Sequence, residues 1–120
     1  MTVAVDFDNT LAKTKYPEII EPIDKTIHTM IELREMGVKV ILWTCRKGEA
    51  LEDALNFCKE HGLEFDAVNA HLPEDIEKWG GDTRKLWADA YVDDKAYNIK
   101  DLGRLYWEAL GLTEREKRYD

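Results

Sequence analysis

Cysteine is scarce in this chain of 120 residues: two residues, Cys45 and Cys58, are too few for a disulfide framework. No apolar run approaches the roughly 20 residues of a membrane span, and none has the pattern of a signal peptide. Positive charge is also in short supply, since 17 Lys and Arg against 25 Asp and Glu give a net charge of -8. A general nucleic-acid or membrane binder is not expected, because both polyanions would be repelled. These absences predict one folded domain in a reducing cytoplasm, with no membrane partner.

Residue patterns for zinc and for thiol chemistry are missing too. The three histidines have no metal-ligand spacing, and no HExxH or Cys-His cluster occurs. A thiol phosphatase needs an Arg about six residues after its Cys, to close a phosphate-binding loop. Leu51 stands at that place after Cys45, so this chemistry is discounted. Cys58 falls on an apolar stripe and is predicted to be a core residue.

Short apolar runs alternate with amphipathic stripes along the chain. The stripes, at helical spacing, begin at Ile23, Leu51 and Leu102. The apolar runs predict strands over residues 2–6, 38–43, 65–69 and 88–92. This alternation predicts an α/β fold, a three-layer sandwich with a mostly parallel, Rossmann-like sheet and helices on both faces. We assign residues 1–112 to one core domain and 113–120 to a charged tail.

Polar residues that bear chemistry follow three of these strands. Asp6 and Asp8 come at the end of the first strand, Thr44 after the second, and Asp93 and Asp94 after the fourth. Ligands of parallel sheets bind beyond the carboxyl ends of the strands. If the first and fourth strands are neighbours, like charges roughly 4 Å apart repel by about 4 kcal/mol at an effective dielectric near 20. Such a cluster persists only if some of the carboxyls are protonated or a cation binds. Oxygen ligands suit a hard cation, usually Mg²⁺, which points toward phosphate chemistry.

These residues resemble the motifs of the haloacid dehalogenase (HAD) superfamily of phosphotransferases. Residues 3–11 are similar to its first motif, residues 40–44 to its second, and residues 91–94 to its fourth. The third motif is a lone Lys ahead of the last strand, and Lys85 matches best, with Arg84 as the adjacent alternative. The motifs stand in the family's order and span almost the whole chain.

The resemblance implies an activity and a role for each motif residue. Asp6 would be the nucleophile that forms an aspartyl-phosphate, and Asp8 the general acid and then the general base. Thr44 would donate a hydrogen bond to a phosphoryl oxygen, and Lys85 would bridge Asp6 and the phosphate. The implied enzyme is a phosphoric monoester hydrolase.

The resemblance also implies a Mg²⁺ site and a form of the fold. The ion would be held by the Asp6 carboxylate, the Asp8 backbone carbonyl and Asp94, with Asp93 acting directly or through water. Cap modules of the family are inserted in intervals that here span residues 9–21 and 70–83, too short for a folded cap. Independently of the resemblance, the sequence over residues 8–21, with Pro17 inside it, is predicted to be irregular. The chain resembles capless members, which use large substrates or a neighbouring subunit to exclude water.

Substrate contacts are predicted near the first two motifs. The substrate would be a phosphorylated small molecule or the phosphorylated end of a macromolecule. Four basic residues near these motifs could reach the substrate, but surface charge is the favoured interpretation of each: Lys13, Lys15, Arg46 and Lys47. The candidates for direct substrate contact are Asn9, Cys45, Arg46 and Lys47.

Two other functions remain open. A signalling receiver domain also gathers paired acids, a Thr and a Lys around Mg²⁺, but it places its acid pair early and its acceptor Asp mid-chain. Here the Asp-x-Asp motif comes first and the acid pair last, which favours the hydrolase. A catalytically inactive HAD fold used for binding is less favoured, because every candidate catalytic position is filled. The four Trp are interpreted as packing residues, including Trp43 near the predicted site.

Overall fold

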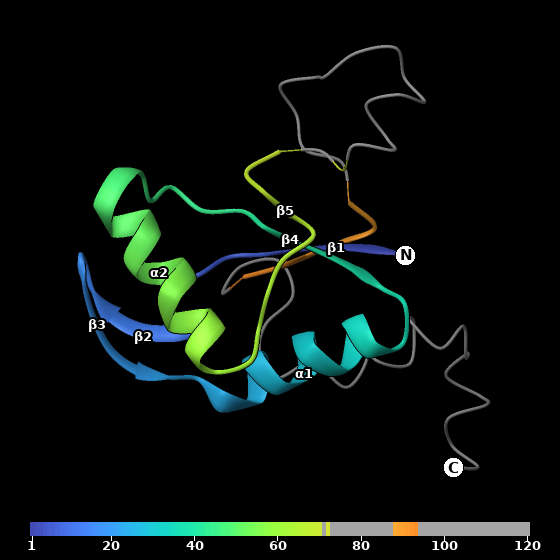
Figure 1. Cartoon of the computed structure of the whole chain (residues 1–120), viewed down its shortest axis with the longest axis horizontal. Helices are drawn as coiled ribbons and strands as arrows, with labels where there is room; N and C mark the ends of the chain where they lie inside the picture. The colour runs from blue at the N-terminus through green and yellow to red at the C-terminus, as the bar shows by residue number, and fades with distance from the viewer. Residues whose placement is uncertain (71, 73–87, 94–120) are drawn as a thin grey trace.

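A four-stranded parallel sheet forms the centre of the molecule (Figure 1). The computed structural model describes residues 1–70, 72 and 88–93. The strand order is β5-β4-β1-β6. These strands span Thr2–Val5 (β1), Lys39–Leu42 (β4), Ala67–Val68 (β5) and Ala90–Val92 (β6). Each of them falls inside one of the four runs predicted from the sequence, although each is shorter.

The first and last of these strands are direct neighbours. β1 pairs with β4 on one side and with β6 on the other, and Val5 lies opposite Val92 across the β1–β6 pair. Parallel pairing brings the carboxyl ends of both strands to the same edge of the sheet. Asp6 and Asp93, which follow β1 and β6 and are more than 80 residues apart in sequence, therefore lie at one edge.

Two helices pack on one face of this sheet and close the main core. Helix α1 spans Asp24–Glu35 and helix α2 spans Gly48–Glu60. Helix α1 stops before Gly37, whose φ of 92° is a left-handed conformation that ends helices readily. The side chains of alternate strand residues meet those of both helices in one fully buried cluster, which includes Val3, Val5, Val40, Leu42, Ile27, Met30, Leu33, Ala54 and Cys58. None of the described helices is long and apolar enough to cross a membrane.

The opposite face of the sheet carries a second, smaller apolar cluster. Ala4, Ile41 and Leu72 are buried there, and Tyr91 packs against them. Both described helices lie on the first face, and the predicted helix beginning at Leu102 lies outside the described residues, as does the predicted tail. The chain has the predicted α/β class with a parallel, Rossmann-like sheet, consistent with a three-layer sandwich.

The interval after β1 is a β-hairpin, so the prediction of an irregular segment is wrong. Strands β2 (Ala12–Lys15) and β3 (Glu18–Pro22) pair antiparallel as a separate two-stranded sheet. Pro17 sits in the turn between the strands, where it costs no ladder hydrogen bond. Lys13 is exposed and pairs with Glu21 across the hairpin at 3.2 Å, so the interpretation of this lysine as surface charge is confirmed.

Candidate functional site

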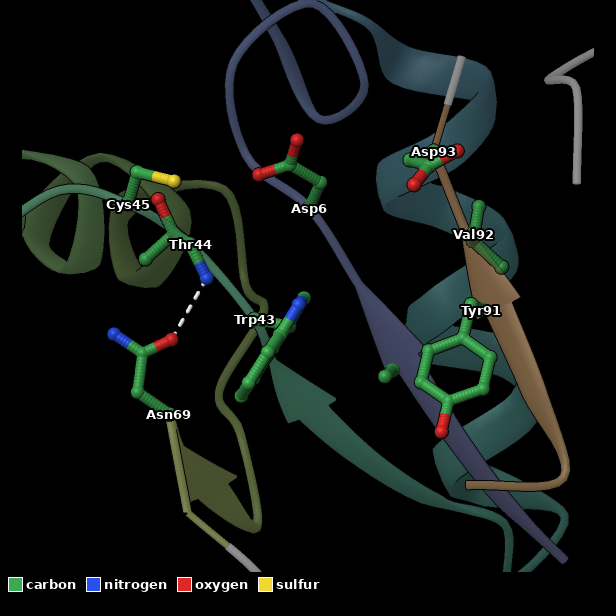
Figure 2. A pocket seen from close by; sticks show the side chains of 9 residues that line it. Asp6, Trp43, Thr44, Cys45, Asn69, Tyr91, Val92 and Asp93 are labelled. Carbon is green, nitrogen blue, oxygen red and sulfur yellow. Dashed lines mark hydrogen bonds between the residues drawn. The ribbon is translucent and has the colours of Figure 1, made fainter. Parts of the chain in front are cut away.

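A cavity of about 580 Å³ opens at the carboxyl ends of the parallel strands. Its described lining comes from all four strands of the main sheet or from the residues just beyond them (Figure 2). The lining residues are Ala4, Asp6, Trp43, Thr44, Cys45, Asn69, Tyr91, Val92 and Asp93. Three of the predicted catalytic or metal-binding positions, Asp6, Thr44 and Asp93, are among them.

Asp6 is held at the end of the central strand by hydrogen bonds of the backbone. Its N–H donates to the Val92 carbonyl at 3.0 Å, which extends the β1–β6 pairing by one residue. Its Oδ1 accepts a hydrogen bond from the Phe7 N–H at 2.7 Å. Figure 2 shows the Asp6 side chain between Thr44 on one side and Asp93 on the other. The pairing of the first and last strands, which the predicted site requires, is confirmed, and it puts Asp6 and Asp93 at the edge of one cavity; their sharing of a metal ion stays a prediction, and Asp94, Lys85 and Arg84 lie outside the described residues.

Thr44 is fixed by two hydrogen bonds that leave its hydroxyl proton to donate. Its backbone N–H donates to Asn69 Oδ1 at 2.7 Å, and its Oγ1 accepts a hydrogen bond from the Arg46 N–H at 3.1 Å. A hydroxyl that accepts one hydrogen bond still carries a donor that can rotate toward an acceptor. The geometry suits the role predicted for Thr44, donation to an anionic oxygen in the cavity.

Asp8 is engaged by a buried arginine. The guanidinium of Arg46 donates from Nη2 to Asp8 Oδ1 at 2.8 Å and from Nε to Oδ2 at 3.0 Å. Thr14 of the hairpin donates its hydroxyl to the same Oδ1 at 2.8 Å. Partial burial raises the pKa of the Asp8 carboxyl, but the hydrogen bonds from Arg46 and Thr14 and the charge of Arg46 outweigh it, so the pKa lies below its ordinary value.

The environment of Arg46 differs from the one predicted for it. Its side chain is 0% exposed, so the interpretation as surface charge is wrong. Nη1 donates to the carbonyls of Pro17 and Ala50, and the guanidinium lies 4.9 Å from the centre of the Phe7 ring. The aromatic ring of Tyr16 lies on it as well, at 5.1 Å. These contacts direct its donors toward protein groups, because a buried guanidinium needs partners for its charge and its N–H groups.

The donor chemistry of the site fits a hard divalent cation. Asp6 and Asp93 supply carboxylate oxygens at one edge, and oxygen donors of this kind are those that Mg²⁺ prefers. The Asp8 carboxylate is engaged with Arg46, and the expected contribution of this residue to a metal site, through its backbone carbonyl, stays a prediction. Within the described residues, no group of three His, Cys, Asp or Glu could hold a metal ion. The expected ligand Asp94 belongs to the part of the chain outside that description.

The other predicted substrate positions occupy different settings. Cys45 is exposed and lines the cavity. Lys47 is an exposed residue at the start of helix α2. Asn9 adopts a φ of 58°, and its backbone N–H donates to the Ala12 carbonyl at 2.7 Å, so it shapes the entry to the hairpin. Contact of these residues with a substrate stays a prediction.

Sequence reasoning missed Asn69 and misjudged Trp43. Asn69 follows β5 as Thr44 follows β4, with a φ of 50° that Asn tolerates better than most residues, so the reasoning about strand ends could have found it. Trp43 is 43% exposed and lines the cavity, which contradicts its interpretation as a packing residue. The prediction for Cys58 is confirmed: it is fully buried in the core, and burial raises the pKa of its thiol to about 12.

Neither a known family model nor a curated protein matches the chain. One solved structure that is similar to it is described as that of "the conserved protein coded by locus from Bacteroides thetaiotaomicron". The two sequences are 38% identical over 97% of this chain and 95% of the other, and the structures superimpose with a TM-score of 0.77. That description names no activity. At this identity over nearly the full length of both proteins, the chain belongs to the same family as the conserved Bacteroides protein.

Proposed function

We propose that the chain is a Mg²⁺-dependent phosphatase that hydrolyses phosphoric monoesters through an aspartyl-phosphate on Asp6. The single observation that carries the proposal is the pairing of β1 with β6, which puts Asp6 and Asp93 at one edge of the sheet. Thr44 lines the same cavity, so a nucleophile, a second carboxylate and a hydroxyl donor face one space (Figure 2). This combination suits an anionic substrate that arrives with a cation.

The reaction would take two displacements at phosphorus. A carboxylate oxygen of Asp6 forms a bond to phosphorus while the bond to the leaving oxygen breaks, and Asp8 gives its proton to that oxygen. Water then attacks the phosphorus of the aspartyl-phosphate, and Asp8 accepts a proton from this water. The bond between phosphorus and Asp6 breaks, which releases inorganic phosphate and regenerates both carboxyl groups.

The surrounding residues would support these steps. Thr44 donates its hydroxyl to a phosphoryl oxygen, and Lys85 is expected to add positive charge beside Asp6. Mg²⁺, when bound, neutralises the charge that otherwise keeps a carboxylate and a phosphate apart. The lowered pKa of Asp8 favours the carboxylate form that accepts a proton from water. A phosphate dianion entering the cavity acts in the opposite direction, because a nearby negative charge raises a carboxyl pKa and so favours the acid form.

The proposed substrate is a phosphorylated small molecule or the phosphorylated end of a macromolecule. In the described first interval the chain carries a short hairpin in place of a folded cap. A large substrate could itself cover the cavity and exclude water. The net charge of -8 argues against broad affinity for nucleic acid.

The test is hydrolysis of p-nitrophenyl phosphate with Mg²⁺ and with EDTA. We expect multiple turnovers with Mg²⁺ and none with EDTA. Asp6→Asn should abolish turnover while circular dichroism and the denaturation midpoint stay close to wild type. The matched control is Asp53→Asn, the same substitution at an exposed position of helix α2, which should keep full activity. Most of the activity surviving in Asp6→Asn would exclude the nucleophile, and one phosphate bound per chain without turnover would favour a receiver-like acceptor.

A further inference from the structure

We propose that Arg46 is a positioning residue, which holds the carboxylate of Asp8 and the hydroxyl of Thr44 in the arrangement that phosphoryl transfer needs. The inference rests on the phosphatase function proposed above. It assigns to Arg46 an action through Asp8 and Thr44, with no contact to substrate. Three segments of the chain meet at this one side chain: the loop after β1, the turn of the hairpin, and the first turn of helix α2.

Because the Arg46 side chain is buried, protein groups rather than solvent must stabilise its charge. Its side chain is 0% exposed, whereas the Asp8 side chain keeps 28% of its surface in contact with solvent. A buried cation is costly unless a carboxylate and further acceptors satisfy it. Arg46 has such partners in Asp8, in two backbone carbonyls and in two aromatic rings. The partly exposed Asp8 thus presents its carboxylate from a rigid, buried support.

The two oxygens of Asp8 are held unequally. Oδ1 accepts two short hydrogen bonds, from Arg46 Nη2 and from the Thr14 hydroxyl, each at 2.8 Å. Oδ2 accepts a single longer bond of 3.0 Å from Arg46 Nε. Donors from two directions prevent rotation of the carboxylate. Arg46 Nε also makes a longer contact of 3.3 Å with Oδ1, so this oxygen has three donors. Oδ2, which shares only Nε, is therefore the oxygen with capacity to exchange a proton with a leaving group or with water.

Arg46 also contacts Thr44, the last residue of the segment (residues 40–44) that resembles the second HAD motif. The backbone N–H of Arg46 donates to Thr44 Oγ1 at 3.1 Å, while its side chain reaches Asp8. The contact of Nη1 with the Pro17 carbonyl, at 3.1 Å, ties the hairpin turn to both groups. A change at Arg46 would therefore disturb proton transfer by Asp8 without removing the nucleophile Asp6.

Such a disturbance has a kinetic signature that general loss of structure lacks. A poor leaving group such as phenolate needs a proton as the bond to phosphorus breaks, whereas 2,4-dinitrophenolate leaves without one. General acid catalysis contributes typically about 10²- to 10⁴-fold to a rate. The ratio kcat/KM reports the steps up to departure of the leaving group, so it isolates this contribution from the later hydrolysis of the aspartyl-phosphate.

The experiment compares phenyl phosphate with 2,4-dinitrophenyl phosphate, with Mg²⁺, for wild type and Arg46→Lys. Lysine keeps the charge but loses the paired hydrogen bonds to Asp8. We expect kcat/KM for phenyl phosphate to fall by about 100-fold, the scale expected for a displaced catalytic group, with little change for the dinitrophenyl ester. Arg34→Lys is the matched control: Arg34 makes a similar paired contact with Asp66, neither residue belongs to the described cavity lining, and the substitution should alter neither value.

Thr14→Val tests the same support if Arg46→Lys does not fold. It removes the other donor to Asp8 Oδ1 from a half-buried hairpin position, and should lower kcat/KM selectively for phenyl phosphate, by less than Arg46→Lys. Equal losses for both esters in a folded variant would overturn the inference while leaving the phosphatase function in place. A wild type that hydrolyses neither ester would overturn both.

Discussion

Thr44 illustrates how a single residue gains a role from its neighbours. Its backbone N–H is held by Asn69 and its hydroxyl oxygen by the backbone of Arg46. The hydroxyl proton remains to be donated, and Thr44 lines the same cavity as Asp6 (Figure 2). The role of this residue in the proposed reaction therefore depends on that one donor.

Replacing that donor gives a prediction at the scale of one residue. Thr44→Val keeps the shape of the side chain but removes the hydroxyl, so kcat/KM for p-nitrophenyl phosphate should fall by about 10²- to 10³-fold, as when one donor of an oxyanion site is removed. Steady-state kinetics with Mg²⁺ measures the effect. Thr44→Ser retains the donor and should stay near wild type; a Val variant as active as the Ser variant would show that the hydroxyl plays no part.

Individual residues differ in how far the sequence predicts them. The place of Asp6 follows from local information: an apolar run marks a buried strand, and the residue stands at its end. The burial of Arg46 does not, because its partners Asp8 and Pro17 are 38 and 29 residues away in sequence. Arginine is mostly exposed in proteins, so a local pattern assigns it to the surface. Only the fold brings its partners together.

Between elements, Asp66 joins helix α1 to the strands. It stands just before β5, accepts hydrogen bonds from Arg34 in the last turn of α1 at 3.2 and 3.3 Å, and accepts the Val40 N–H of β4 at 2.8 Å. Burial raises the pKa of the Asp66 carboxyl, but the hydrogen bonds of Val40 and Arg34 outweigh it, and the pKa lies below its ordinary value. The ionised form of Asp66 is therefore the one that stabilises this junction.

The junction predicts a pH dependence of stability. A carboxyl whose pKa is lower in the folded than in the unfolded chain contributes stability above the unfolded value, near 4, and loses it as pH falls through the folded value. Asp66→Asn should lower the free energy of unfolding by about 1.5–3 kcal/mol at pH 7, the range for hydrogen bonds to charged groups. The difference from wild type should shrink below about pH 4. Urea denaturation at several pH values measures it.

The control for this prediction is Asp53→Asn, which makes the same change on an exposed part of helix α2. The free energy of unfolding of this variant should differ little from that of wild type at every pH, because isolated surface charges contribute little to stability. If the difference in free energy of unfolding between Asp66→Asn and wild type stayed constant down to pH 3, packing rather than ionisation would explain the effect of Asp66.

The hairpin shows which elements escape prediction. Its strands carry lysines and glutamates on exposed positions and few apolar residues, so no alternating apolar pattern marks them. Ala12 and Leu11 are buried, and Pro17 in the turn is held through its carbonyl by Arg46. The hairpin is stabilised by contacts with distant segments, which a local pattern does not record. The strands of the main sheet, by contrast, are mostly apolar and, apart from the half-buried β5, largely buried, and the sequence predicts each of them.

At the scale of the whole molecule, the strand order brings together the residues of the proposed site. The order β5-β4-β1-β6 makes β1 the partner of both β4 and β6. Residues from the first and last described strands thereby line one cavity with residues that follow β4 and β5. The sequence predicts the class of sheet from its alternation of elements. It does not predict that β1 and β6 are neighbours, which is known only from the folded structure.

This neighbourhood predicts that Mg²⁺ stabilises the fold. An ion bound by acids that follow β1 and β6 would join two ends of the described chain and bind only the folded state, which raises the free energy of unfolding by about 2.7 kcal/mol at an ion concentration 100 times the dissociation constant. Chemical denaturation with Mg²⁺ or with EDTA measures the gain. Asp93→Asn should reduce it, because one expected oxygen ligand is replaced, whereas Asp53→Asn should retain it. An equal gain in wild type and Asp93→Asn would exclude Asp93 from the metal site, and no gain in wild type would argue against the site itself.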